Sequence, residues 1–185
     1  MTTASIKNRI QEVSDPSTQR ALYELFESIR SELAELKTDS VINAPILGVG
    51  STAENVATTT FQYRIDGVPY LRLAVLAGTA LGITDTINTG TATGTFYGGF
   101  AEQVNISGTL SFKSVATDQV YTSEAAAEVA ARTITADANS VIIGYFVVGA
   151  AADSAWTAGT DDLTAGSDCT SVTFWSAADS HFLTE

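Results

Sequence analysis

The sequence predicts a mainly β protein: a compact β-sandwich or half-open barrel with one short Ala-rich helix, preceded by an N-terminal helical segment and an extended arm. Three observations lead to this fold class. Residues 58–77 carry the pattern of a β-hairpin, and residues 140–149 form an apolar run that suits a strand buried on both faces. The composition, with 45% hydrophobic and 16% charged residues, also favours strands joined by short turns over a helical bundle.

The predicted hairpin turns at Asp66-Gly67. A two-residue turn of this kind needs positive φ at both central positions, which aspartate tolerates and glycine favours. Large side chains then face each other across the two strands, and such pairs contribute much of the stability of a sheet. The expected register pairs Ile65 with Val68, Tyr63 with Tyr70 and Phe61 with Arg72.

A second hairpin is expected within residues 91–116, with its turn at Ser107-Gly108. Gly98-Gly99 interrupts the first of its strands, which indicates either a bulge or the close approach of another backbone. The expected core positions of this hairpin are Phe96, Val104, Ile106, Leu110 and Phe112.

Residues 123–132, SEAAAEVAAR, predict a short helix with Thr122 or Ser123 as its N-cap and Arg132 in its last turn. The small side chains of this helix let it lie close against a sheet. Residues 140–149, SVIIGYFVVG, predict the central and most buried strand. Two or three short strands are expected in the tail, around residues 155–158, 162–165 and 171–176.

Two helices are expected before the β-domain. Residues 3–13 suit a short helix, and Asp15-Pro16 then supplies an N-cap and a favourable first position for a longer helix over residues 16–38. The apolar residues of the longer helix fall within an arc of about 100°. They are Leu22, Leu25, Phe26, Ile29, Leu33 and Leu36.

The spacing of these residues indicates how the helix would associate. Leu22, Leu25, Ile29, Leu33 and Leu36 follow one another at steps of three, four, four and three residues. The resulting eleven-residue interval keeps associated helices straight or slightly right-handed. Two hypotheses follow: the stripe packs on the protein's own β-domain, or it forms a trimeric coiled coil or docks on a partner. An amphipathic helix followed by a linker favours the second hypothesis.

Residues 39–56 separate these helices from the β-domain. Pro45, Gly48 and Gly50 prevent a regular helix, yet the segment is too apolar for a solvated linker. We therefore expect an extended arm that lies in a groove of this subunit or of a neighbour. The contact residues predicted for the arm are Val41, Ile42, Ile46 and Leu47. The expected domains are 1–38 for oligomerisation or docking, 39–56 for the arm and 57–185 for an acidic β-domain.

The charge and composition argue against several function classes. The formal net charge is −12, and only four of the basic residues follow residue 40, so we expect no nucleic-acid-binding surface. The start of the chain lacks the apolar segment of a secretory signal, and no apolar run is long enough to span a bilayer. Cys169 is the single cysteine, which excludes a disulfide within the chain.

No motif in the sequence identifies a reaction. His181 is the single histidine and lies near the C-terminus, and Cys169 has no neighbour that would activate it. Trp156 and Trp175 are expected in packing rather than as a sugar-binding pair. We predict no catalytic residue, no cofactor and no metal ligand. Four aspartates lie close together in sequence but match no calcium-loop spacing, and we expect solvated turns there: Asp153, Asp161, Asp162 and Asp168.

Five motifs follow one another between residues 57 and 176. They are TTTFQYRIDGVPYLRLAVLAGTAL, FAEQVNISGTLSFKS, SEAAAEVAAR, VIIGYFVVG and TAGTDDLTAG. As an ordered set, these motifs resemble those of small virion structural proteins of tailed bacteriophages. Residues 1–56 lie outside the resemblance.

The resemblance implies a capsid-associated role, as a decoration (cement) or head-fibre-like protein without catalytic residues. Such proteins commonly form trimers on the outer capsid surface. We therefore expect a homotrimer that binds the major capsid protein in the virion, is present in the host cytoplasm during assembly, and binds neither nucleic acid nor membrane. The alternative is a tail-fibre or spike module that recognises a glycan of the host.

Overall fold

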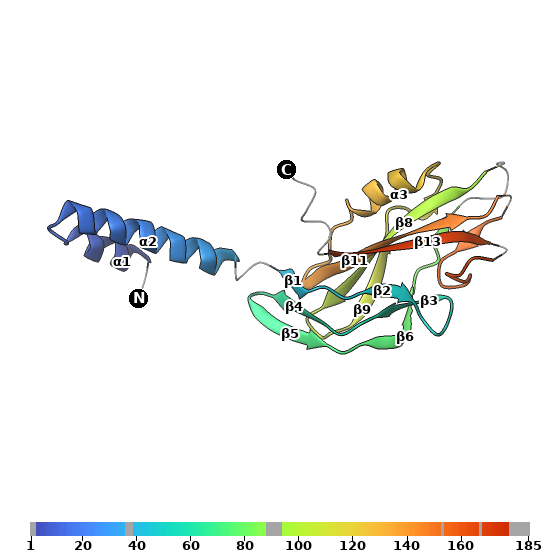
Figure 1. Ribbon diagram of the computed structural model, residues 1–185, viewed down its shortest axis with the longest axis horizontal. Coiled ribbons are helices and arrows are strands. Elements are labelled where there is room, and N and C mark those ends of the chain that lie inside the picture. The colour runs from blue at the N-terminus through green and yellow to red at the C-terminus, as the bar shows by residue number, and fades with distance from the viewer. Residues whose placement is uncertain (1–2, 36–38, 88–93, 153, 167, 178–185) are drawn as a thin grey trace. The chain divides into compact units, whose positions relative to one another are not determined.

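The computed structural model describes residues 3–35, 39–87, 94–152, 154–166 and 168–177 (Figure 1). The protein is mainly β, with several small and mostly antiparallel sheets and three helices in the described residues. The chain divides into two compact units, Met1–Thr38 and Asp39–Glu185. All described strands belong to the second unit, which is called the β-unit below.

The N-terminal unit contains α1 (Thr3–Gln11) and α2 (Pro16–Glu35). Asp15 caps α2, because its carboxylate accepts hydrogen bonds from the backbone N–H of Thr18 and from the hydroxyls of Ser17 and Thr18. These bonds, of which the one from the Thr18 hydroxyl has the largest effect, lower the pKa of Asp15 to about 2. The ionised carboxylate therefore complements the positive end of the helix dipole.

Three stretches of the chain each contribute one strand to each of two three-stranded antiparallel sheets. The strand orders of these sheets are β1-β4-β5 and β2-β3-β6. Where the stretches pass from one sheet to the other, the backbone N–H groups of Ile46 and Ala74 donate hydrogen bonds to the hydroxyls of Thr59 and Thr60. The strands are β1 (Ser40–Asn43), β2 (Leu47–Val49), β3 (Asn55–Thr58), β4 (Phe61–Ile65), β5 (Val68–Arg72) and β6 (Val75–Ala80).

Residues 39–56, which the sequence predicts as an extended arm, contain strands of the β-unit. They supply β1, β2 and the start of β3, and these strands pair with β4, with each other and with β6. Pro45 lies in the turn between β1 and β2, where its missing N–H removes no ladder hydrogen bond. The proline and glycines lie within or between short strands here. A sequence pattern does not distinguish such short strands from an irregular arm.

The hairpin at Asp66-Gly67 is confirmed. Asp66 has φ 51° and Gly67 has φ 79°, so both central residues adopt the expected positive values. The β4–β5 register is the predicted one, with Ile65 opposite Val68, Tyr63 opposite Tyr70 and Phe61 opposite Arg72. The rings of the two tyrosines stack with their centroids 5.3 Å apart.

The largest sheet is antiparallel and has the strand order β13-β11-β8-β9. Ten of the eleven residues of β11 are buried, which confirms the prediction of a central, buried strand over residues 140–149. A smaller sheet has the order β10-β7-β12, in which β10 and β7 are parallel. The strands of these two sheets are β7 (Thr86–Ile87), β8 (Phe96–Asn105), β9 (Leu110–Ser114), β10 (Asp118–Gln119), β11 (Ser140–Ala150), β12 (Trp156–Thr157) and β13 (Cys169–Ser176).

The core lies on the face of the four-stranded sheet that meets the other sheets. Phe100 and Phe146 stack there with ring centroids 5.1 Å apart, and Trp156 packs edge-on against Phe100 at 5.7 Å. A second cluster joins β4 to the four-stranded sheet through Phe61, Tyr63, Ile65, Val104, Leu110, Val141 and Ile143.

Glu102 of β8 is buried in this unit without a partner. It lies opposite Phe112 of β9 and Gly144 of β11, and neither carboxyl oxygen has a hydrogen-bond partner among the described residues. Burial raises the pKa of Glu102 well above its ordinary value of 4.5. The carboxyl group of the folded protein is therefore protonated over a pH range in which that of the unfolded chain is ionised.

The opposite face of the four-stranded sheet is covered by α3 (Glu124–Ala131; Figure 1). Ser123 is the N-cap and accepts a hydrogen bond from the backbone N–H of Ala126, so the predicted Ala-rich helix is confirmed. A methyl group added at Gly99 of β8 would lie 2.5 Å from the carbonyl oxygen of Ala127. Because the β8–β11 register is regular here, Gly99 marks a close approach rather than a bulge.

One local prediction is wrong. Ile106 was expected in the core, but it is 45% exposed. The strand β8 ends at Asn105, whose side-chain oxygen accepts hydrogen bonds from the N–H groups of Ser107 and Thr109 and so places Ile106 in the turn. Of the two or three short strands predicted in the tail, two are present as β12 and β13, and residues 162–165 form no strand.

Gly99→Ala tests the close approach of α3. The added methyl group would meet the backbone of α3, so we expect the free energy of unfolding to fall by about 1–3 kcal/mol. Gly48→Ala is the matched control, because a methyl group at Gly48 of β2 would meet no atom within 4 Å. Urea denaturation measures both effects, and equal stabilities of the two variants would contradict this packing.

Glu102→Gln tests the neutral buried carboxyl group. Above about pH 4.5 the unfolded chain releases the Glu102 proton while the folded chain keeps it, so the contribution of this group to the stability of the wild type should fall with rising pH. The glutamine variant lacks this contribution. The difference in unfolding free energy, variant minus wild type, should therefore rise by about 1.4 kcal/mol per pH unit until the folded-state pKa is reached. Parallel stability curves in urea denaturation at several pH values would contradict it.

Candidate functional site

Helix α2 carries an exposed apolar stripe. Four of its predicted contact residues lie along one side of the helix, at steps of three, four and four residues. Leu22, Leu25, Ile29 and Leu33 are 36%, 56%, 47% and 54% exposed. Leu36, predicted as the next member of the stripe, lies outside the described residues. Side chains of this size are normally buried in a helix that has all its partners.

A neighbouring side of α2 is covered by α1. Ile10 of α1 is buried, and the hydroxyl of Tyr23 donates a hydrogen bond to the carbonyl oxygen of Lys7. The Nζ atom of Lys7 lies 5.7 Å from the ring centroid of Phe26 and 2.9 Å from the carboxylate of Glu27. Phe26, which the sequence placed with the stripe, therefore contacts α1. The apolar residues that the sequence groups on one side of the helix thus belong to two adjacent surfaces: the exposed stripe and the side that contacts α1.

The four contact residues predicted within 39–56 separate into two pairs. Leu47 is buried in the core, and Val41 is partly buried against the cluster that contains Phe61. Both side chains therefore stabilise their own subunit. Ile42 and Ile46 are 45% and 75% exposed. Ile46 also lines a hollow of about 330 Å³ between the β1–β2 turn and β13.

Three exposed leucines of the β-unit were not among the contact residues predicted from the sequence. Leu71, Leu73 and Leu76 are 61%, 64% and 72% exposed and belong to β5, to β6 or to the link between these strands. Leu71 lies opposite Gln62, so it occupies the face of the hairpin away from the stacked tyrosines. The alternation of side chains along the predicted hairpin is the signal that could have identified Leu71 on this outer face.

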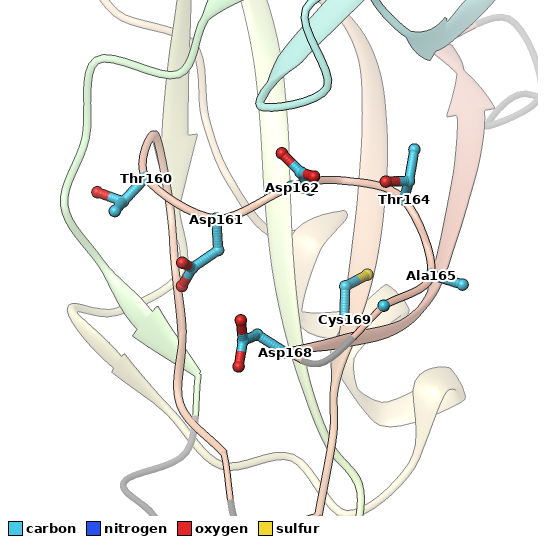
Figure 2. A pocket seen from close by; sticks show the side chains of 8 residues that line it. Thr160, Asp161, Asp162, Thr164, Ala165, Asp168 and Cys169 are labelled. Carbon is cyan, nitrogen blue, oxygen red and sulfur yellow. The ribbon is translucent and has the colours of Figure 1, made fainter.

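A polar hollow of about 280 Å³ is lined by residues between 160 and 169 (Figure 2). Asp161 and Asp168 point toward the same space, whereas Asp162 points away from it. Asp161 accepts a hydrogen bond from the N–H of Thr157, and Asp168 accepts one from the hydroxyl of Ser154, so both carboxylates stabilise turns. Within the described residues, no cluster of three or more His, Cys, Asp or Glu is arranged to hold a metal ion.

Cys169 and Trp156 are both buried. The thiol of Cys169 lies 3.6 Å from the carbonyl oxygen of Ser171, and burial raises its pKa, which makes the thiolate nucleophile scarce. Trp156 donates its indole N–H to the carbonyl oxygen of Asp162 and offers no face to a sugar. Trp175, on another strand, lies beside the guanidinium group of Arg132. Asp153 and His181 lie outside the described residues.

No described helix is both long and apolar enough to cross a membrane. The chain matches no family model, no curated protein and no solved structure. The exposed stripe of α2 is a surface that both the sequence pattern and the described residues identify.

Proposed function

We propose that the chain is a non-enzymatic structural protein of a tailed-bacteriophage virion, which decorates the capsid exterior as a homotrimer and stabilises the head. The exposed stripe of α2 is the observation that carries this proposal. Its partners are other copies of the chain and the major capsid protein. The protein is present in the host cytoplasm during assembly and on the capsid surface afterwards.

Burial of the stripe would stabilise an oligomer considerably. Full burial of one leucine or isoleucine side chain contributes roughly 1.5–3 kcal/mol. Leu22, Leu25, Ile29 and Leu33 are about half exposed, so burial of the remaining area would contribute roughly 3–6 kcal/mol per chain. In a trimer, all three chains make this contribution, which offsets the entropy lost on association.

The β-unit would form the outer part of such a particle. We propose that its sheets pack as a β-sandwich, with α3 on the outside of the four-stranded sheet. The residues after position 40 include fourteen acidic and four basic side chains. This excess of negative charge keeps unassembled copies apart and suits a surface that faces solvent or covers joints between capsid subunits.

A glycan-recognition module of a tail fibre or spike is the weaker proposal. Such a module would need an exposed aromatic platform for a sugar ring. Trp156 is buried, which leaves Trp175 and the acidic turns near residue 161 as its candidates.

Ile29→Asp tests the role of the stripe. A charge in the middle of the buried interface costs several kcal/mol, so the variant should sediment as a single chain of 19.3 kDa, whereas the wild type sediments at three times that mass. Ser31→Asp introduces the same charge at an exposed position on another side of α2 and should remain trimeric. A trimeric Ile29→Asp variant, or a monomeric wild type, would contradict the proposal.

The copy number in the virion tests the role in the capsid. A decoration protein occupies repeated sites on the shell, so its amount in purified particles should be of the same order as that of the major capsid protein. Quantitative mass spectrometry of the phage that encodes the chain measures this ratio. A ratio far below that of the major capsid protein would instead favour the tail-fibre function.

A further inference from the structure

The strand β13 is an edge strand without the usual protection against further pairing. It lies at the end of the β13-β11-β8-β9 sheet, and no other described strand pairs with the outer side of its residues 172–175, which is called the free edge below. The backbone of residues 172–175 makes hydrogen bonds to no described residue outside β11. Since backbone groups in a strand alternate in direction, about half of them point to this free edge. Such groups are a template for one more strand.

Two other edges of the β-unit are protected by their side chains. Pro69 removes an N–H group from the edge strand β5, and the Lys113 ammonium group on β9 is held by Asp137 and the carbonyl oxygen of Thr135. Charged residues and proline are common means of preventing edge pairing. In contrast, β13 is eight residues long, CTSVTFWS, and contains no charged residue, proline or glycine.

A hollow adjoins this free edge. It has a volume of about 330 Å³ and lies between β13 and the turn that joins β1 to β2. Its lining is mainly apolar and consists of Ala44, Pro45, Ile46, Leu47, Phe174, Trp175 and Ser176. Two charged groups contact side chains of β13 from the α3 side of the sheet: Glu124 bonds Thr173, and Arg132 lies beside Trp175. Asp168 precedes the strand at its other end, away from the residues that line the hollow.

We propose that β13 and this hollow bind an extended, uncharged segment of a partner protein. The segment would add as a strand to the free edge of β13 and insert one large apolar side chain into the hollow. Main-chain hydrogen bonds then supply affinity, and the hollow selects the side chain. An uncharged segment fits because neither β13 nor the described lining of the hollow offers a charged side chain to pair with it. This site is distinct from the stripe of α2 and does not depend on the trimer.

Hydrogen–deuterium exchange of the full chain tests the proposal directly. The probe is an end-blocked peptide of alternating threonine and valine with a central phenylalanine, Thr-Val-Thr-Phe-Thr-Val-Thr. At about 1 mM peptide, exchange of the amides in residues 170–175 should slow several-fold, because outward N–H groups gain carbonyl partners. A peptide with aspartate in place of the central phenylalanine should lose this protection. Unchanged exchange in β13, or protection only in β5 and β6, would overturn the proposal.

Two exposed residues provide matched variants. Ile46→Asp places a charge at the lip of the hollow, at a side chain that is 75% exposed, and should abolish the protection of β13 by the peptide. Leu76→Asp places the same charge on β6, at a side chain that is 72% exposed and does not line the hollow, and should retain it. Equal protection in both variants would overturn the role of the hollow. Protection of β13 that rises with protein concentration in the absence of peptide would identify a second copy as the occupant and overturn the partner proposed here.

Discussion

The β-unit depends on the burial of β11 on both of its faces. A strand with ten buried residues cannot leave either face to water, so one cover must pack on each side. Two glycines permit both covers to come close: Gly99 admits the backbone of α3, and Gly144 admits the side chain of Leu47 from β2. The buried side-chain amide of Gln119 in β10 bonds both the N–H and the carbonyl group of Gly99, next to the end of the β8–β9 pairing.

The N-terminal unit buries few apolar side chains compared with the β-unit. Its helix α2 has apolar residues on more than one side, and the short helix α1 covers only the side with Tyr23 and Phe26. Its ion pairs are partly or largely exposed, so they add little stability. A two-helix unit with so small a core gains most from burying Leu22, Leu25, Ile29 and Leu33 against another surface. The proposed assembly role and the stability of this unit thus have the same physical origin.

Sequence patterns predicted the features that local chemistry determines. The Asp66-Gly67 turn, the Ser123 cap and the apolar strand β11 each follow from a few adjacent residues. Contacts between segments that are distant in the sequence could not be predicted in this way. Periodicity alone does not show that α1 contacts Phe26 or that residues 39–56 contain strands. The hollow beside β13 depends on residues near 45 and near 175, which no sequence pattern links. The stripe of α2 was predictable from the spacing of its apolar residues. The molecule that covers the stripe was not, because spacing within one helix does not identify a binding partner.

The protonated carboxyl group of Glu102 also changes the electrical properties of the molecule. Between the ordinary pKa of a glutamate and the raised pKa of folded Glu102, the unfolded chain carries this group as an anion, so folding takes up a proton from the solvent. Within that pH range this group makes the native chain less negative than the unfolded chain. Folding in weakly buffered solution should raise the pH slightly, and the native and unfolded chains should differ in isoelectric point even though their compositions are identical.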